Sequence, residues 1–304
     1  MSAYDYGLLD ALAAVMREGT FEAAARSLNV TQSAVSQRIK QLEERLGGIV
    51  VVRGRPCAPT ELGLQLYNHV EQVRLLEHQL NRTIDSKSNQ HGNQAAILRI
   101  AVNSDSLSTW FPSVVRRASR ELLVHFDIVA DDQEHTNDKL TSGSALAAIT
   151  ASEVPIQGFR RTPLGSMEYL AVASQEYAAK YFPDGVTINA IKDAPSILFD
   201  RKDTLPVQWL LRAFGETVNI SGHMIPSFDG YMGCCLNGTG WGMMPTSAVE
   251  RYIANGRMVE IMPNTRIQVP LHWQSSTKSS EILKQLASIV VEEARKALGQ
   301  QSQS

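Results

Sequence analysis

Hydrogen-bond donors collect on one short segment of the chain, between residues 31 and 40. The side chains are hydroxyls, amides and cations: Thr31, Gln32, Ser33, Ser36, Gln37, Arg38 and Lys40. No acidic residue lies between Glu22 and Glu43. A polyanion docked here would meet donors and cations without repulsion, and base edges in a DNA groove offer the acceptors that amides and hydroxyls recognise. The segment therefore has the chemistry of a nucleic-acid-binding surface.

Two short helices must position these donors. Apolar residues from Phe21 to Leu28 recur at helical spacing, and Asn29-Val30 then breaks the pattern. Thr31 is a good N-cap for the second helix. That helix has an apolar stripe opposite the donors, made of Val35, Ile39, Leu42 and Leu46. The short junction and the donor-rich second helix favour a helix-turn-helix over an amphipathic helix in an ordinary bundle.

A possible wing follows. Ile49 to Val52 is a short apolar strand, and Arg53-Gly54-Arg55-Pro56 comes next. The glycine allows a tight hairpin with Arg53 and Arg55 at its tip, where they can reach phosphates or the minor groove. Between Arg26 and Arg55 there are six bases and two acids, a net charge of +4, although the whole chain has a net charge of -2. The basic patch is local, as expected for a DNA-binding head on a neutral protein.

These motifs together resemble a known family. The run AAARSLNVTQSAVSQRIKQLEERLG, followed by VVVRGR and PTELG, resembles the DNA-binding head of the LysR-type transcriptional regulators. Three later segments, NSDSLSTW, EYLAVAS and KYFPDGVT, are similar to the branch of that family that responds to lysine and arginine. The resemblance covers almost the whole chain. It implies a DNA-binding transcription regulator and not an enzyme.

A long helix is predicted from Thr60 to about Ile84. Its apolar residues step by three or four and include Leu66, Val70, Val73, Leu76 and Leu80. The resemblance implies that this helix forms a dimer interface, and a palindromic site needs two heads. The alternative is that the stripe packs on its own head. Residues 86–94 are polar and are predicted to form a hinge.

From Ile97 onward strands alternate with helices, which predicts a mostly parallel α/β sheet. The resemblance implies a two-lobed sensor like a periplasmic binding protein. The predicted architecture is thus a winged helix-turn-helix, a linker helix and an α/β sensor. The predicted boundaries are 1–59 for the head, 60–94 for linker and hinge, and 95–304 for the sensor, with lobe I at 95–160 and 264–304 and lobe II at 161–263.

The effector, the small molecule that the sensor binds, needs polar partners in the sensor. By resemblance it is L-lysine or L-arginine, whose distal cation requires a carboxylate. Ser104 or Asp105 is expected to cap a helix that runs to about Arg117. Serines at this helix start suit an α-carboxylate, and acids at strand ends suit the cation. The candidate residues are Ser104, Asp105, Ser106, Trp110, Asp131, Thr150, Phe199, Asp200, Ser227 and Asp229. Asp200 and Asp229 are favoured, because each follows an aromatic residue.

Signatures of other chemistry are weak. The seven histidines form no HxH or HExxH pair and no GxSxG elbow occurs, so no catalytic residue, metal site or cofactor is predicted. The three cysteines Cys57, Cys234 and Cys235 are an odd count that fits a reducing, cytoplasmic location. No apolar stretch is long enough to span a bilayer.

The resemblance also implies partners: an operator in double-stranded DNA, a second copy in a homodimer, a homotetramer of such dimers, and RNA polymerase. Regulated genes would serve basic-amino-acid export or metabolism. Three alternatives stay open: a regulator that senses another small carboxylate, an architectural or replication-origin DNA-binding protein, and an enzyme with an appended DNA-binding head.

Overall fold

The computed structural model describes most of the chain. The described residues are 5–85, 95–131, 140, 145–152, 154, 156–277 and 280–298, without the side chains of residues 78, 79, 81–85 and 131. The chain forms two compact units, Met1–Val102 with Val115–Thr162 and Trp273–Ile289, and Asn103–Val114 with Pro163–His272 and Val290–Ser304. No helix in the described part is long and apolar enough to cross a membrane.

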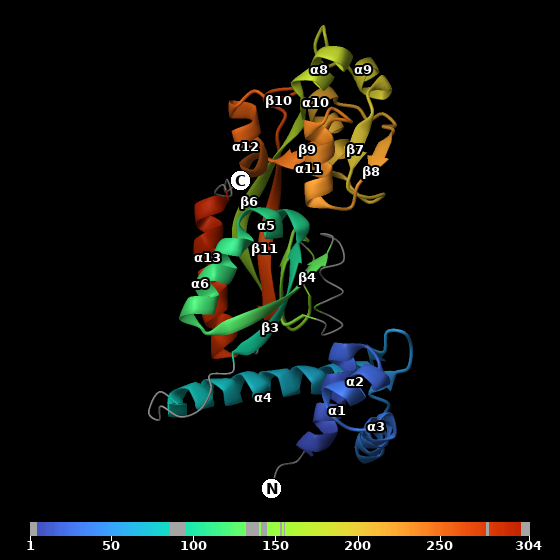
Figure 1. Cartoon of the computed structure of the whole chain (residues 1–304), viewed down its shortest axis with the longest axis vertical. Coiled ribbons are helices and arrows are strands. Elements are labelled where there is room, and N and C mark those ends of the chain that lie inside the picture. The colour runs from blue at the N-terminus through green and yellow to red at the C-terminus, as the bar shows by residue number, and fades with distance from the viewer. Residues whose placement is uncertain are drawn as a thin grey trace. The chain divides into compact units, whose positions relative to one another are not determined.

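The first unit begins with a helical head (Figure 1). Its elements are α1 (Tyr6–Glu18), α2 (Phe21–Ser27), α3 (Gln32–Leu46), β1 (Val51–Val52) and β2 (Ala58–Pro59). Side-chain oxygens of Asp5, Thr20 and Thr31 accept hydrogen bonds from the first turns of the three helices, as N-caps do. The antiparallel pair β1 and β2 forms the wing. The predicted helix-turn-helix and its Thr31 cap are therefore confirmed.

A single apolar core holds the head together. From α3 it takes Val35, Ile39 and Leu42, all buried against α1 and α2. Each fully buried aliphatic side chain contributes about 1.5–3 kcal/mol. Because that stripe is fixed inside, the opposite face of α3 is held toward solvent.

The linker helix α4 (Glu61–Asp85) starts against the wing. The Thr60 hydroxyl donates to the Ile49 carbonyl at 2.7 Å and accepts from the Gly63 N–H at 3.1 Å. A Cβ at Gly63 would lie 1.9 Å from the Val50 carbonyl oxygen, so only glycine allows this close approach. The first turn of α4 therefore packs directly against the strand segment of the head.

The same unit carries one side of the sensor sheet. Its strands are β3 (Ala96–Asn103), β4 (Val124–Asp131) and β5 (Ala147–Thr150), with helices α6 (Phe111–Glu121) and α13 (Glu281–Ala297) reaching into this unit. Strands β3 and β5 are parallel, with Ile100 opposite Ala147. The order in the whole sheet is β10-β6-β11-β5-β3-β4, and β9 also pairs with β6.

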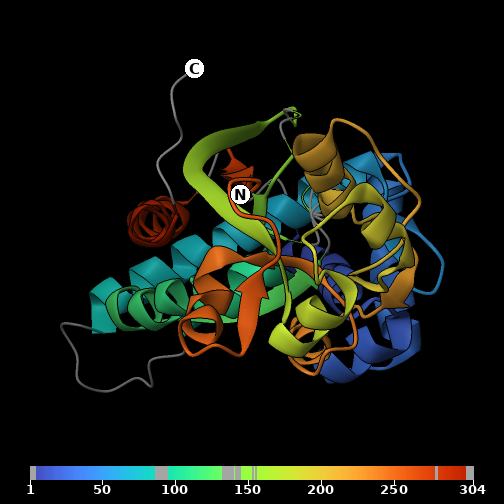
Figure 2. The same ribbon diagram turned by 90° about the horizontal axis from the view of Figure 1, so that it is seen from above.

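The second unit holds most of the remaining elements. They are α5 (Ser104–Thr109), β6 (Phe159–Ser174), α8 (Gln175–Tyr181), α9 (Ile188–Asp193), β7 (Ser196–Leu198), α10 (Leu205–Phe214), β8 (Gly222–Met224), α11 (Phe228–Leu236), β9 (Gly242–Pro245), α12 (Thr246–Ala254), β10 (Met258–Glu260) and β11 (Ile267–Ser276). Strands β7 and β8 are parallel. Figure 2 shows that the long strand β6 is bent. Gly165 of β6 has a φ of 122°, a conformation that glycine tolerates best.

Three sequence predictions need correction. The sheet is mixed, because β9 and β10 both run antiparallel to β6. The helix expected from residue 104 to 117 is two helices, which separate at Trp110. Neither Ser104 nor Asp105 is the N-cap of the first of them, since Asn103 occupies that position without a side-chain cap hydrogen bond. The lobe boundaries after residues 160 and 263 remain predictions.

Candidate DNA interface and effector site

The outward face of α3 presents most of the predicted DNA-binding side chains. Gln32, Gln37 and Lys40 are exposed, while Ser36 and Arg38 are half-buried. Hydroxyls at the start of the helix are already engaged. Thr31 Oγ1 accepts from the Ala34 N–H at 3.2 Å and lies 2.9 Å from Ser33 Oγ.

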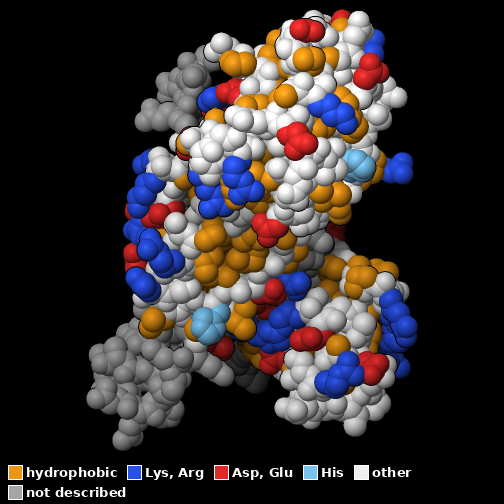
Figure 3. Space-filling view, turned by 45° about the horizontal axis from the view of Figure 1, so that its top comes forward, with side chains coloured by type: hydrophobic (Ala, Val, Ile, Leu, Met, Phe, Trp, Pro, Cys, Tyr) orange, Lys and Arg blue, Asp and Glu red, His pale blue; other side chains and the backbone are white. Residues whose placement is uncertain are grey.

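Lys40 and the two wing arginines differ in how firmly they are held. Lys40 lies 3.7 Å from Glu44 with both side chains well exposed, a pair worth about 0.3–0.5 kcal/mol that a phosphate can replace. The Arg53 guanidinium lies 5.1 Å above the Phe21 ring, a cation–π contact that orients it. Arg55 is exposed. Figure 3 shows Lys and Arg side chains along the outer margin of the head.

The linker helix divides its apolar stripe between two environments. Leu66 and Val70 are 6% and 1% exposed and belong to the head's own core, so they are not free to form a dimer seam. Their prediction as dimerisation residues needs this correction. Val73 is half-buried, and Leu76 and Leu80 are 54% and 59% exposed.

In the second unit, α5 carries a half-buried carboxyl group, that of Asp105. Asp105 accepts a hydrogen bond of 2.5 Å from the Tyr169 hydroxyl of β6. Burial raises the pKa of Asp105 to about 6, and the charge of Asp203 adds to that rise, whereas the Tyr169 hydrogen bond opposes it. A proton therefore leaves this carboxyl close to physiological pH.

The second carboxyl of the cluster, Asp203, precedes α10. It accepts from the backbone N–H groups of Phe199, at 3.2 Å, and Leu205, at 3.1 Å. Burial raises the pKa of Asp203, the two N–H donors lower it, and the charge of Asp200 raises it again. Neither Asp105 nor Asp203 forms an ion pair with any Lys, Arg or His in the described part of the chain. Two neighbouring, half-buried carboxyls without a cation create a locally negative potential that suits a cationic ligand.

Further polar groups flank Asp105 along the chain. Asn103 is 2% exposed and Ser106 is fully buried, and the amide atoms of one and the hydroxyl of the other have no partner among the described residues. A buried polar group left unsatisfied costs about 1–3 kcal/mol. Both side chains can donate to a ligand carboxylate, so they complement the two acids.

The other predicted effector residues lie in several places. Ser104 is the first residue of α5, and Thr150 is buried and accepts from the Ser152 N–H at 2.9 Å. Phe199 packs against the second unit's core. The side chain of Asp131 lies outside the described residues. The two favoured acids, Asp200 and Asp229, differ in whether they lie near Asp105 and Asp203.

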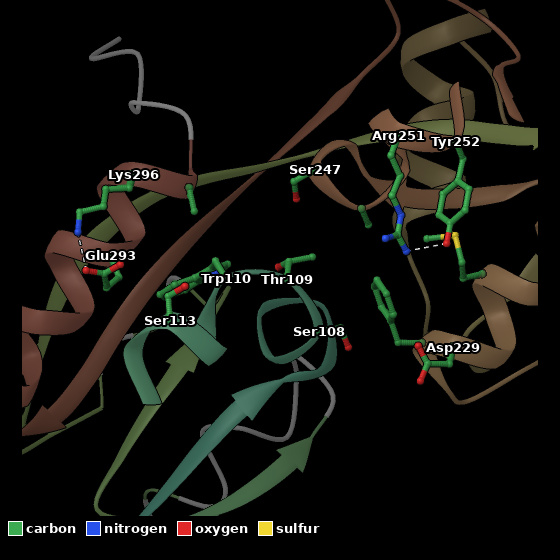
Figure 4. Close-up of a pocket in the computed structure, with 14 residues that line it drawn as sticks. Ser108, Thr109, Trp110, Ser113, Asp229, Ser247, Arg251, Tyr252, Glu293 and Lys296 are labelled. Carbon is green, nitrogen blue, oxygen red and sulfur yellow. Dashed lines mark hydrogen bonds and ion pairs between the residues drawn. The ribbon is translucent and has the colours of Figure 1, made fainter. Parts of the chain in front are cut away.

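Asp200 lies beside the buried pair, whereas Asp229 lines a different pocket. Asp200 accepts from the Lys202 N–H at 2.6 Å and is half-buried. Ser227 caps α11 by accepting from the Gly230 N–H at 3.3 Å. Exposed Asp229 lines a pocket with Trp110 and Arg251 (Figure 4).

Asp203 was not among the residues predicted from sequence. The local signal was present: Asp203-Thr204-Leu205-Pro206 places an acid just before a helix with proline in its first turn. Such an acid is usually taken for a cap, and only the fold shows that it is buried near Asp105. No group of three or more His, Cys, Asp or Glu side chains suited to a metal ion occurs within the described ranges.

A winged helix-turn-helix, joined by a long helix to an α/β sensor with a polar buried site, defines a one-component transcription regulator. Residues 7–64 match the bacterial regulatory helix-turn-helix proteins of the lysR family, and residues 91–295 match the LysR substrate binding domain. The chain therefore belongs to the LysR family of DNA-binding transcriptional regulators.

Similar proteins extend over almost the full length. The HTH-type transcriptional regulator ArgP of Pseudomonas aeruginosa is 40% identical over 286 residues, 94% of each chain. The crystal structure of ArgP from Mycobacterium tuberculosis is 35% identical with a TM-score of 0.83, covering 98% of this chain and 100% of that one. Full-length LysG from Corynebacterium glutamicum, with bound effector Arg, is 30% identical with a TM-score of 0.73, covering 97% and 100%.

Proposed function

We propose that this regulator senses a basic amino acid, L-arginine or L-lysine, and controls genes of basic-amino-acid export or metabolism. The observation that carries the proposal is the buried pair of Asp105 and Asp203, which has no cationic partner among the described residues. The LysG structure with bound Arg and the full-length similarity to ArgP support it.

The effector's groups have complementary partners in the second unit. The distal cation pairs with Asp203 and Asp105, while Tyr169 keeps the Asp105 carboxyl oriented. The α-carboxylate accepts from the Asn103 amide and the Ser106 hydroxyl, which are otherwise unsatisfied. A buried charge pair of this kind rejects an analogue that lacks the cation, because the carboxylates would then be left unpaired.

The head binds the operator as a homodimer, through α3 in the major groove and the wing beside it. Gln32, Ser36 and Gln37 contact base edges, while Lys40, Arg53 and Arg55 contact phosphates. Leu76 and Leu80 of α4 contribute to the dimer interface, since they are exposed apolar residues among those of α4 whose side chains the structure describes. Two dimers form the tetramer that contacts RNA polymerase.

Selection from a random-sequence duplex pool tests this function. Full-length protein, with and without L-arginine or L-lysine, should enrich a partly palindromic site whose half-sites lie about one helical turn or a multiple apart. The basic amino acid should change the affinity for, or the length of DNA protected at, that site. Enrichment of no common sequence would instead favour an architectural DNA-binding protein. Enrichment without any effect of either amino acid would favour a regulator of another small carboxylate.

A further inference from the structure

A second pocket in the second unit has the features of another ligand site. It has a volume of about 770 Å³. Its lining comes from α5, from Trp110 and the start of α6, and from α11, α12 and α13 (Figure 4). Asp105 and Asp203 are not among its lining residues, so the pocket is separate from the buried acid pair. We propose that it binds a zwitterionic amino acid with an apolar side chain, in addition to the basic effector.

Two opposite charges in the pocket lack an ion-pair partner. The Arg251 guanidinium lies 4.6 Å above the Tyr252 ring and donates to its hydroxyl at 2.6 Å, but contacts no carboxylate among the described residues. Asp229 likewise has no cation within the described part of the chain. Arg251 can therefore bind an α-carboxylate and Asp229 an α-ammonium.

The other charged pair is already satisfied. Lys296 donates to Glu293 at 2.6 Å, and Figure 4 marks this contact with a dashed line. Glu293 is 9% exposed and hence committed to that bond. The pocket thus offers no free carboxylate for a distal cation beyond Asp229, and this argues against lysine or arginine as its ligand.

A buried donor adds a second, independent indication of a ligand. Trp110 lines the pocket, is 5% exposed, and its indole N–H has no acceptor among the described residues. Indole N–H groups that are buried usually find an acceptor. A ligand carboxylate supplies one. The remaining walls combine serine and threonine hydroxyls with apolar groups, and Phe228, Met232 and Ala248 are available to an aliphatic side chain.

Calorimetric titration of the full-length protein tests the proposal. With the protein saturated by L-arginine, L-norleucine should still bind. Hexanoate, which lacks the ammonium, and pentylamine, which lacks the carboxylate, should each bind at least about tenfold more weakly. Arg251→Met and Asp229→Asn should each weaken norleucine by at least about tenfold. Arg212→Met is the matched control on α10 and should change nothing, because Arg212 is exposed and outside the pocket.

One variant in each proposed site distinguishes the second pocket from the basic-effector site. Arg251→Met should retain arginine binding, which also shows that the variant is folded, while Asp203→Asn should lose arginine and retain norleucine. If norleucine fails to bind at millimolar concentration, is displaced by arginine, or binds Arg251→Met as it binds the parent, the second site does not exist. The absence of norleucine binding, or unchanged binding by Arg251→Met, would leave the basic-effector proposal intact, whereas displacement by arginine would count against the selectivity claimed for the acid pair.

Discussion

At the scale of single residues, the most informative feature is the buried pair of Asp105 and Asp203. Each carboxyl alone has an ordinary structural explanation: Asp105 is bonded to Tyr169, and Asp203 binds two backbone N–H groups. Their proximity, which raises the pKa of Asp105, is not needed for either role. Two buried acids without a base destabilise the fold, and natural sequences retain such costs mainly at functional sites.

Asp203→Asn should weaken arginine and lysine binding by roughly 2–5 kcal/mol, because a desolvated cation would lose its partner. The amide oxygen of Asn can still accept from one of the Phe199 and Leu205 N–H groups, which bond different oxygens of Asp203, so the fold should be weakened but should survive. Asp200→Asn should have a smaller effect, since Asp200 is bonded to the Lys202 N–H and is not among the charges that shift the pKa of Asp105. Asp193→Asn, exposed on α9, is the matched control. A larger loss from Asp200→Asn than from Asp203→Asn, measured by calorimetry, would contradict this assignment.

Asp105 should also make stability depend on pH. Its pKa is raised from 3.8 to about 6 in the folded protein. The folded state therefore binds the proton more tightly than the unfolded state, and stability falls as pH rises from about 4 to 6 and is level above that. The difference is roughly 3 kcal/mol. Asp105→Asn should reduce this fall in chemical denaturation series, and what is left should come from Asp203, whose pKa is also raised. An identical pH profile in the variant and the parent would show that Asp105 is not the titrating group.

The sequence indicated some of these residues and not others. Asp105 was found because it starts a predicted helix after a strand, which is a local pattern. Asp200 and Asp229 were preferred because each follows an aromatic residue. Asp203 differs from them in lying close to Asp105, and this proximity depends on how distant segments pack, so no local pattern could point to Asp203.

At the scale of elements, α3 and the wing should divide DNA recognition between them. Gln32→Ala should cost about 1–3 kcal/mol on the selected operator and little on random duplex, because an amide reads base edges. Lys40→Ala should weaken both duplexes alike and reduce the salt slope by about one unit. Gln41→Ala, also exposed on α3 but outside the predicted face, is the control. Fluorescence anisotropy across a salt series measures all three, and parental binding by both test variants would show that α3 is not the recognition helix.

The linker helix supplies the second prediction at this scale. Leu76→Asp with Leu80→Asp should shift the protein toward monomers in analytical ultracentrifugation and abolish operator binding, because charges would enter an apolar interface. The head should stay folded, since its core uses Leu66 and Val70 instead. Unchanged sedimentation would mean that the chains associate through another surface.

Elements with local signals were predicted well. The caps, the helix-turn-helix and the linker helix follow from residues close in sequence, and all are present. The sheet was predicted as mostly parallel, because alternation of strands and helices does not reveal strand direction. The antiparallel pairing of β6 with β9 and β10 is non-local, and the sequence held no turn signal for it.

At the scale of the whole molecule, α4 connects the DNA-binding head to the sensor in the chain. An effector can regulate DNA binding only if it binds one arrangement of the assembly better than another. The acid pair provides a reason for strong effector binding. The coupling free energy between effector binding and DNA binding comes from the difference between the effector-free and effector-bound arrangements. Such coupling free energies are typically 1–3 kcal/mol.

The central claim is that the sensor recognises the cation of a basic amino acid. The most direct test is calorimetric titration of the full-length protein with L-arginine and with L-citrulline, which has nearly the same shape but no distal charge. The account predicts that arginine, or lysine in a parallel titration, binds at least about thirtyfold more tightly than citrulline, in line with the cost of leaving a buried charge unpaired. Equal affinities for arginine and citrulline, with lysine no tighter than either, would contradict it.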